Sequence, residues 1–168
     1  MAFEENYLSW VRDAHAMEIQ AETMLEKMVD RLEHYPALIA RLQLHLQETR
    51  QQQALLQSVI DRLNTSNSTF KDALGKMAAI SQAMGGMFAD DEVVKGAICG
   101  YAFESFEIAC YTSLIAAADV VGDSEGARVF EQIREQEIAM AEWSLINLPE
   151  LTEQFLMRDA TPGVEAKK

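Results

Sequence analysis

The 168-residue chain has little proline, glycine or cysteine. Because it contains only three Pro and eight Gly, long helices are seldom interrupted, and a sheet protein with many turns is disfavoured. Its two cysteines, Cys99 and Cys110, lie too far apart along one predicted helix to form a disulfide with each other. We therefore expect two reduced packing residues and no redox pair.

Long apolar runs and basic charge are also lacking. No stretch of about 18 apolar residues predicts a transmembrane helix. The first residues carry acids where a signal peptide carries bases, so we predict a cytoplasmic protein. The 27 Asp and Glu outnumber the 14 Lys and Arg, and the formal net charge of -13 repels phosphate backbones and anionic headgroups. We expect neither nucleic acid nor a membrane as a partner.

Apolar residues make up 49% of the chain and recur at three-and-four spacing. This period predicts four long amphipathic helices, over about residues 5–34, 37–63, 92–121 and 125–147. Pro36 fits the first turn of the second helix, Gly122 ends the third, and Pro149 is expected to end the fourth. For residues 64–91 we predict a long crossover that contains at most one short helix.

Two helical hairpins joined by a long crossover are the pattern of one known architecture. The crossover makes the second and third long helices run parallel, which predicts an all-α, ferritin-like four-helix bundle. The length suits a single domain. We expect the bundle over residues 1–160 and a flexible C-terminal tail over residues 161–168.

Each predicted apolar stripe is interrupted near its middle by polar side chains. The interruptions are Glu18 in the first helix, His45, Glu48, Thr49 and Gln52 in the second, Glu104 and Glu107 in the third, and Glu137 in the fourth. They lie at matching distances from the bends predicted near Tyr35 and Asp123, so antiparallel pairing brings them into one layer. Several ionised carboxylates in a low-dielectric core are severely unfavourable unless positive charge compensates them.

Two divalent cations would supply that charge, and clustered carboxylates suit iron or manganese. An ion-pair network is the alternative, but the arginines lie mostly off the stripes or away from the polar layer; these are Arg12, Arg41, Arg62 and Arg134. His15 and His45 each precede a stripe glutamate by three residues, and we interpret them as hydrogen-bonding residues and not as ligands. We interpret Tyr111 as a packing residue with a polar tip.

Stretches of all four helices carry a resemblance to a known family. They are residues 13–20, residues 45–49 with Gln52, residues 104–111 and residues 135–137. Over nearly the whole chain the sequence resembles the YciE/YciF family of ferritin-like bacterial proteins, and its YciE branch most closely. The resemblance implies a dimetal centre, a homodimer and a link to bacterial stress response. It implies Glu18, Glu48, Glu104, Glu107 and Glu137 as metal ligands, with Gln52 as a weaker ligand or a neighbour of the ligands.

The chain also departs from the usual ferritin-like pattern. Such di-iron sites commonly carry Glu-x-x-His on two helices, whereas Gln51 and Met140 stand three residues after Glu48 and Glu137. Ala141 stands where relatives often have Asp. A scaffold with a degenerate site is therefore one alternative to an active centre.

Our leading hypothesis is a site for two transition-metal ions, with iron favoured over manganese. Dioxygen or peroxide would be the small-molecule oxidant, and the activity would be that of a non-haem oxidase or a peroxidase. The rival hypothesis is a metal-free structural or interaction homodimer, in which the glutamates are protonated or paired with arginine. Iron storage is a third and weaker hypothesis, because one small bundle does not make a shell.

Overall fold

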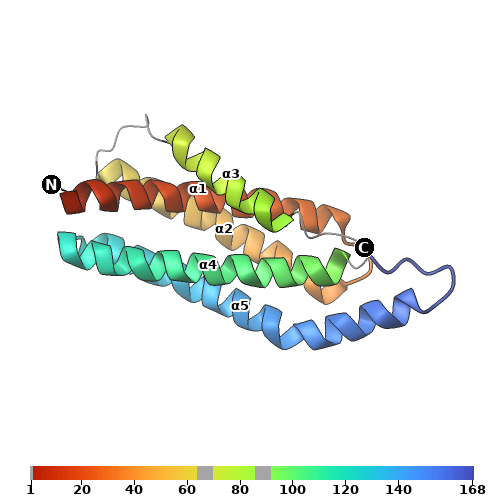
Figure 1. Cartoon of the computed structure of the whole chain (residues 1–168). Coiled ribbons are helices and arrows are strands. Elements are labelled where there is room, and N and C mark those ends of the chain that lie inside the picture. The colour runs from red at the N-terminus through yellow and green to blue at the C-terminus, as the bar shows by residue number, and fades with distance from the viewer. Residues whose placement is uncertain (1, 64–69, 86–91) are drawn as a thin grey trace.

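The computed structural model describes residues 2–63, 70–85 and 92–168 (Figure 1). Within these ranges the secondary structure is entirely helical. The helices are α1 (Ala2–Arg31), α2 (Pro36–Arg62), α3 (Phe70–Gly85), α4 (Glu92–Val121) and α5 (Ser124–Asp159). No helix in the described part of the chain combines the length and the apolarity needed to cross a bilayer. The all-α prediction is confirmed.

The four long helices form a bundle in which each contacts two neighbours. Helices α1 and α2 form one hairpin and α4 and α5 the other, and further contacts join α1 to α4 and α2 to α5. Helix α2 and helix α4 run in the same direction (Figure 1), as the long crossover requires. Helix α3 packs on the outer side of α1. The predicted ferritin-like bundle is therefore confirmed.

Pro149 does not end the last helix, contrary to the sequence-based prediction. It lies inside α5, which continues to Asp159 and extends beyond the start of α4 (Figure 1). A proline inside a helix loses one backbone hydrogen bond and crowds the preceding turn. The turns after it bury Leu151 and Phe155 in an apolar cluster with Tyr35 and Leu38. This packing offsets the local cost of the proline.

Residues 161–168, for which we predicted a flexible tail, fold back onto the bend between α1 and α2. The backbone N–H of His34 donates to the carbonyl of Lys168 at 3.1 Å. The Tyr35 hydroxyl donates to the carbonyl of Ala166, and Ala166 is itself buried. The tail thus contributes to the packing around Tyr35.

Two apolar clusters occupy the two ends of the bundle. One is centred on large side chains from four helices, Tyr7, Leu56, Leu114 and Phe130. The other gathers Leu25, Leu42, Met140 and Phe155 with their neighbours. Along each long helix the buried polar residues fall between members of these clusters. The core therefore consists of two apolar ends and a polar layer at mid-height.

Asp123 ties three helices together at one end of the bundle. Its Oδ1 accepts from the backbone N–H of Gly126 at 3.0 Å, which caps the first turn of α5. Its Oδ2 accepts from the Tyr7 hydroxyl of α1 at 2.7 Å and from Arg62 Nη2 of α2 at 2.8 Å. One carboxylate thus serves a helix cap and two long-range contacts.

Replacing Asp123 by alanine is expected to lower the free energy of unfolding by about 1–2 kcal/mol, because the cap and the acceptor for Tyr7 are both lost. Urea denaturation followed by circular dichroism measures the change. The matched control is Asp119→Ala, since Asp119 is exposed on α4 one turn earlier, and its effect should stay within about 0.5 kcal/mol. Equal losses in the two variants would contradict this account of Asp123.

Candidate metal centre

Acidic and polar side chains from all four long helices meet in the layer between the two apolar clusters. Each of the following is at most 4% exposed: Glu18 from α1, His45, Thr49 and Gln52 from α2, Glu104 and Glu107 from α4, and Glu137 from α5. The polar interruptions of the four stripes therefore do come together inside the bundle. Glu48 of α2 lies at the edge of the layer, with its side chain 21% exposed.

The imidazole of His45 lies at the centre of this layer and faces carboxylates from three helices. Its Nδ1 is 2.8 Å from Oε2 of Glu48. Its Nε2 is 3.2 Å from Oε2 of Glu104 and 3.2 Å from Oε2 of Glu137. Burial by itself lowers the pKa of His45, but the charge of Glu104 and the hydrogen bonds to the surrounding acids raise it to about 12. In the absence of a metal the ring is therefore a buried imidazolium.

Four residues of the layer are arranged closely enough to share one cation. His45, Glu104, Glu107 and Glu137 are all buried, and each offers one ligand atom within 4.8 Å of the other three. Oε1 of Glu107 has no hydrogen-bond partner within residues 2–63, 70–85 and 92–168, while Oε2 of Glu104 and Oε2 of Glu137 share one nitrogen, Nε2 of His45. Carboxylate oxygens with one imidazole nitrogen are a donor set that suits first-row transition metals. The residues present therefore fit a metal ion.

Glu18 belongs to the same layer on the side of α1. Its Oε1 accepts a hydrogen bond from the hydroxyl of Tyr111, and both side chains are fully buried. Its other oxygen, Oε2, has no hydrogen-bond partner in the described residues. Burial raises the pKa of Glu18 well above its ordinary value, and the charge of Glu137 raises it further. Glu18 thus adds a further buried carboxyl group, with one oxygen that has no partner in the described residues, to the centre.

Two of the predicted ligands contact the inner residues instead of joining the group of four. Glu48 faces Nδ1 of His45 and lies 3.4 Å from Nη1 of Arg41. Gln52 Nε2 donates to Oε1 of Glu137 at 2.5 Å and to Oε1 of Gln136 at 2.9 Å. In these positions Glu48 orients the imidazole and Gln52 orients a carboxylate.

Comparison with known proteins places the chain in a family. A family model described as "Domain of unknown function (DUF892)" matches residues 2–157. The chain belongs to the DUF892 family. A structure from Xanthomonas campestris pv. campestris is 38% identical, with a TM-score of 0.80, 95% of this chain covered and 99% of that one.

Two named proteins share the architecture of this DUF892 chain. YcfI from Rhodopseudomonas palustris is 26% identical with a TM-score of 0.70, and the match covers 86% of this chain and 93% of YcfI. The E. coli stress protein YciF is 21% identical with a TM-score of 0.73, and the match covers 88% of this chain and 97% of YciF. These likenesses show a shared fold, while membership of the YciE/YciF family and a closer relation to YciE stay predictions.

In the metal-free DUF892 bundle, some of the buried glutamates are neutralised by protons instead of by metal cations. Burial raises the pKa of Glu104 to about 8, against the opposing effect of His45. Burial, followed by the charge of Glu137, raises the pKa of Glu107 well above its ordinary value. Burial also acts to raise the pKa of Glu137, but hydrogen bonds from His45 and other neighbours lower it overall. Glu137 is therefore the inner acid that stays ionised beside the imidazolium.

The structure adds one candidate ligand, His45, that we did not rank among the metal ligands of this DUF892 member. We interpreted it as a hydrogen-bonding residue, and the structure places it among the four grouped donors. The spacing of the residues on α2 could have indicated that His45 is buried among the donors. His45, Thr49 and Gln52 continue the three-and-four spacing of Leu42 and Leu56, and all are buried. Glu48, which we ranked above His45, lies one position off that line.

Proposed function

We propose that this DUF892 protein binds two transition-metal ions per chain in the polar layer, with iron favoured over manganese. The observation that carries the proposal is the group formed by His45, Glu104, Glu107 and Glu137, whose donor atoms lie within 4.8 Å of one another in a buried site. Buried oxygens without hydrogen-bond partners among the described residues support it, because such groups are costly unless something pairs with them.

The arrangement suggests which residue holds which ion. His45 Nε2 and the carboxylates of Glu104, Glu107 and Glu137 would hold the first ion, which takes the place of the imidazolium proton. Glu48 accepts from Nδ1 and would keep the ring in the required tautomer. The second ion would lie toward Glu18 and be held by that carboxylate together with the acids it faces. Gln52 would keep Glu137 oriented.

Two bound iron ions would supply reaction with dioxygen or peroxide, which side chains alone lack. The protein's own contribution is to hold the ligands on four helices, to exclude bulk water and to carry protons on Glu18, Glu104 and Glu107. We propose an oxidase or peroxidase function of this kind in bacterial stress response, the setting that the description of YciF gives for that relative. A homodimer in the cytoplasm is part of the same proposal.

Metal counting tests the proposal. Protein purified without chelators and reconstituted with ferrous ion under anaerobic conditions should contain two iron ions per chain by elemental analysis. Glu107→Gln should bind less than half as much, because the amide keeps the shape of the side chain but cannot supply a negative charge. The matched control is Glu22→Gln, since Glu22 pairs with Arg50 outside the layer, and its iron content should be unchanged. Fewer than one ion per wild-type chain would overturn the proposal.

The metal-free structural homodimer remains the second candidate, because His45 supplies a positive charge to the acids without any metal. Melting temperatures of wild type and Glu104→Ala, each with chelator and with manganous ion, separate the two. A metal centre gives a manganese-dependent rise in wild type that is lost in the variant. A purely structural network gives a change in the variant but no manganese effect in either protein. If the melting temperature is the same in all four samples, neither candidate is correct.

A further inference from the structure

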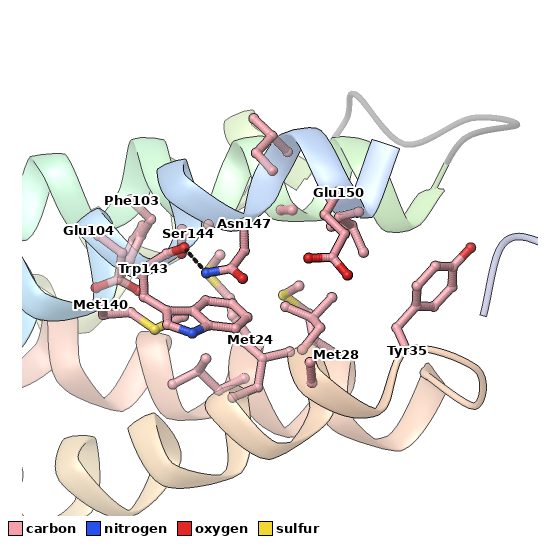
Figure 2. A pocket seen from close by; sticks show the side chains of 18 of the residues that line it. Met24, Met28, Tyr35, Phe103, Glu104, Met140, Trp143, Ser144, Asn147 and Glu150 are labelled. Atoms are coloured by element: carbon pink, nitrogen blue, oxygen red, sulfur yellow. Dashed lines mark hydrogen bonds between the residues drawn. The ribbon is translucent and has the colours of Figure 1, made fainter. Parts of the chain in front are cut away.

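A cavity of about 120 Å³, partly open to solvent, lies beside the polar layer and is lined by α1, α2, α4 and α5. Its walls are mainly apolar and include Met24, Met28, Met140 and Trp143. Figure 2 shows the carboxylate of Glu104 at one end, next to Met140, and Tyr35 at the other end. A molecule in this cavity would therefore lie along the bundle with one end toward the acidic layer.

Glu104 belongs both to the cavity wall and to the candidate metal centre. It is 4% exposed, and its Oε2 lies 3.2 Å from Nε2 of His45. That oxygen faces the imidazole ring, and the carboxyl group as a whole stands at the inner end of the cavity. A carboxyl group has two oxygens with lone pairs, so Glu104 offers a hydrogen-bonding contact to a hydroxyl group that enters the cavity. The cavity therefore combines mainly apolar walls with the carboxyl group of Glu104 at its inner end and further polar side chains on α5, among them Ser144 and Asn147.

The size and the charge of the lining restrict the class of ligand. An apolar cavity of about 150 Å³ stays dry and binds benzene, so the slightly smaller cavity here suits a molecule of about one ring. The described lining residues include two acids, Glu104 and Glu150, and no Lys, Arg or His. A carboxylate or phosphate ligand would therefore be repelled and would find no cation. An ammonium group would lose its hydration beside acids that His45 or the metal ions already balance.

We propose that this cavity binds a small, uncharged, mainly apolar molecule of about one ring in size, whose hydroxyl group lies toward Glu104. Met24, Met28 and Met140 suit such a site, because their flexible thioether chains adapt to different apolar shapes. Binding itself requires only the cavity. That the molecule is the substrate of the metal centre rests on the function proposed above.

Trp143 provides a direct signal for binding, since it lines the cavity. The chain has two tryptophans, and Trp10→Phe leaves Trp143 as the only one. Its emission should change in a saturable manner when cyclohexanol is added to protein without metal. Cyclohexanecarboxylate, which has the same ring and a negative charge, should bind at least about tenfold more weakly. No saturable change with cyclohexanol, or equal binding of the two compounds, would overturn the proposal.

Gly100 allows the cavity to be filled without disturbing its walls. It lines the cavity, and a Cβ added there meets no heavy atom within 4 Å. Gly100→Leu should abolish the cyclohexanol signal and retain the helical spectrum, because leucine is a better helix former than glycine. Gly75→Leu is the matched control on α3, where an added Cβ also meets nothing within 4 Å, and it should bind normally. Normal binding to Gly100→Leu would refute the location.

The contact with Glu104 has its own test in the same background. Glu104→Leu keeps the bulk of the side chain and removes its hydrogen-bonding end, so the apolar ring should still bind. The preference for cyclohexanol over methylcyclohexane, which has nearly the same shape without the hydroxyl group, should fall at least about threefold. An unchanged preference would show that the polar end of the ligand does not lie toward Glu104.

The ligand titration tests the cavity proposal and the metal count tests the metal proposal, so one proposal can be wrong while the other is right. Gly100 is not one of the proposed ligands, so Gly100→Leu should still bind iron. If cyclohexanol does not bind while iron content is normal, the cavity proposal alone is wrong. If cyclohexanol binds to a protein that takes up no iron, the metal proposal and the substrate role are wrong, and the binding site stands.

Discussion

Replacing His45 by leucine is expected to lower the free energy of unfolding of the metal-free protein by about 3–5 kcal/mol at pH 6.5. The imidazolium lies 3.2 Å from carboxylate oxygens of Glu104 and Glu137 and 2.8 Å from Glu48. Leucine fills much of the same volume but supplies no charge. In the folded variant, a buried carboxylate either stays ionised with no positive charge beside it or takes up a proton on folding. That proton uptake is unfavourable at a pH where the same carboxylate is ionised in the unfolded chain.

The pH dependence separates this charge effect from packing. At pH 5 a histidine is protonated both in the folded protein, where the pKa of His45 is raised to about 12, and in the unfolded chain, but at pH 6.5 the unfolded histidine is only about half protonated. In the variant an inner glutamate takes up a proton on folding. The loss of stability caused by the substitution should therefore grow by about 1 kcal/mol per pH unit over this range, slightly less than one full proton would give. Urea denaturation with chelator at both pH values measures it.

Leu42→Ala is the control for the His45 experiment. Leu42 is buried on α2 one turn before His45, and its truncation should cost about 2–5 kcal/mol through lost apolar contact and a cavity. That loss should be the same at pH 5 and at pH 6.5. If the loss in His45→Leu is equally independent of pH, His45 contributes packing and not charge.

The helical period predicted much of this architecture because it encodes which face of each helix is buried. Glu18, Glu104 and Glu137 all lie on apolar stripes, and all three are buried in one layer. Helix pairing in hairpins then fixes their height, since residues at matching distances from a bend face each other. Such a prediction requires only the period and the position of the bends.

The period does not predict the relative depth of neighbouring polar residues on one helix. His45 and Glu48 are three residues apart and lie on the same side of α2, but only His45 is fully buried. Which of them faces the acids of α4 and α5 depends on the rotation of α2 about its axis. That rotation is set by packing of Leu42 and Leu56 in the two apolar clusters, which is a tertiary effect.

The continuation of α5 past Pro149 has a similar explanation. Local preference predicts a helix end before a proline, and that preference is weak compared with the burial of large apolar side chains. Leu151 and Phe155 bury their side chains against the α1–α2 bend only if the helix continues. The sequence contains both signals, but their relative strength depends on contacts with Tyr35 and the C-terminal tail.

Raising the pH from 5 to 7 is expected to destabilise the metal-free protein. Burial, as the largest cause, raises the pKa of Glu18 and of Glu107 well above the ordinary value of 4.5. Each carboxyl group keeps its proton in the folded protein and loses it on unfolding. The stability that it contributes is full below about pH 4.5 and falls as the pH rises toward the folded pKa. The expected slope is about 1.4 kcal/mol per pH unit for each retained proton.

Glu104 and His15 modify this slope in opposite directions. Burial raises the pKa of Glu104 to about 8, so it adds to the loss of stability between pH 5 and 7. Burial lowers the pKa of His15, so its contribution increases with pH through the ordinary value of 6.5. Because one histidine opposes three glutamates, the net trend over this range should remain downward.

Manganous ion should reverse the trend, because metal binding displaces the same protons and becomes tighter as the pH rises. At pH 7 a concentration of 100 times the dissociation constant should add about 2.7 kcal/mol to the free energy of unfolding, and the gain should be smaller at pH 5. Urea denaturation at pH 5, 6 and 7, with chelator and with manganese, gives both slopes. The double variant Glu18→Gln, Glu107→Gln should flatten the metal-free slope and remove the manganese effect, since its amides neither titrate nor supply negative charge. A metal-free slope that is as steep in the double variant as in wild type would place the retained protons elsewhere in the chain.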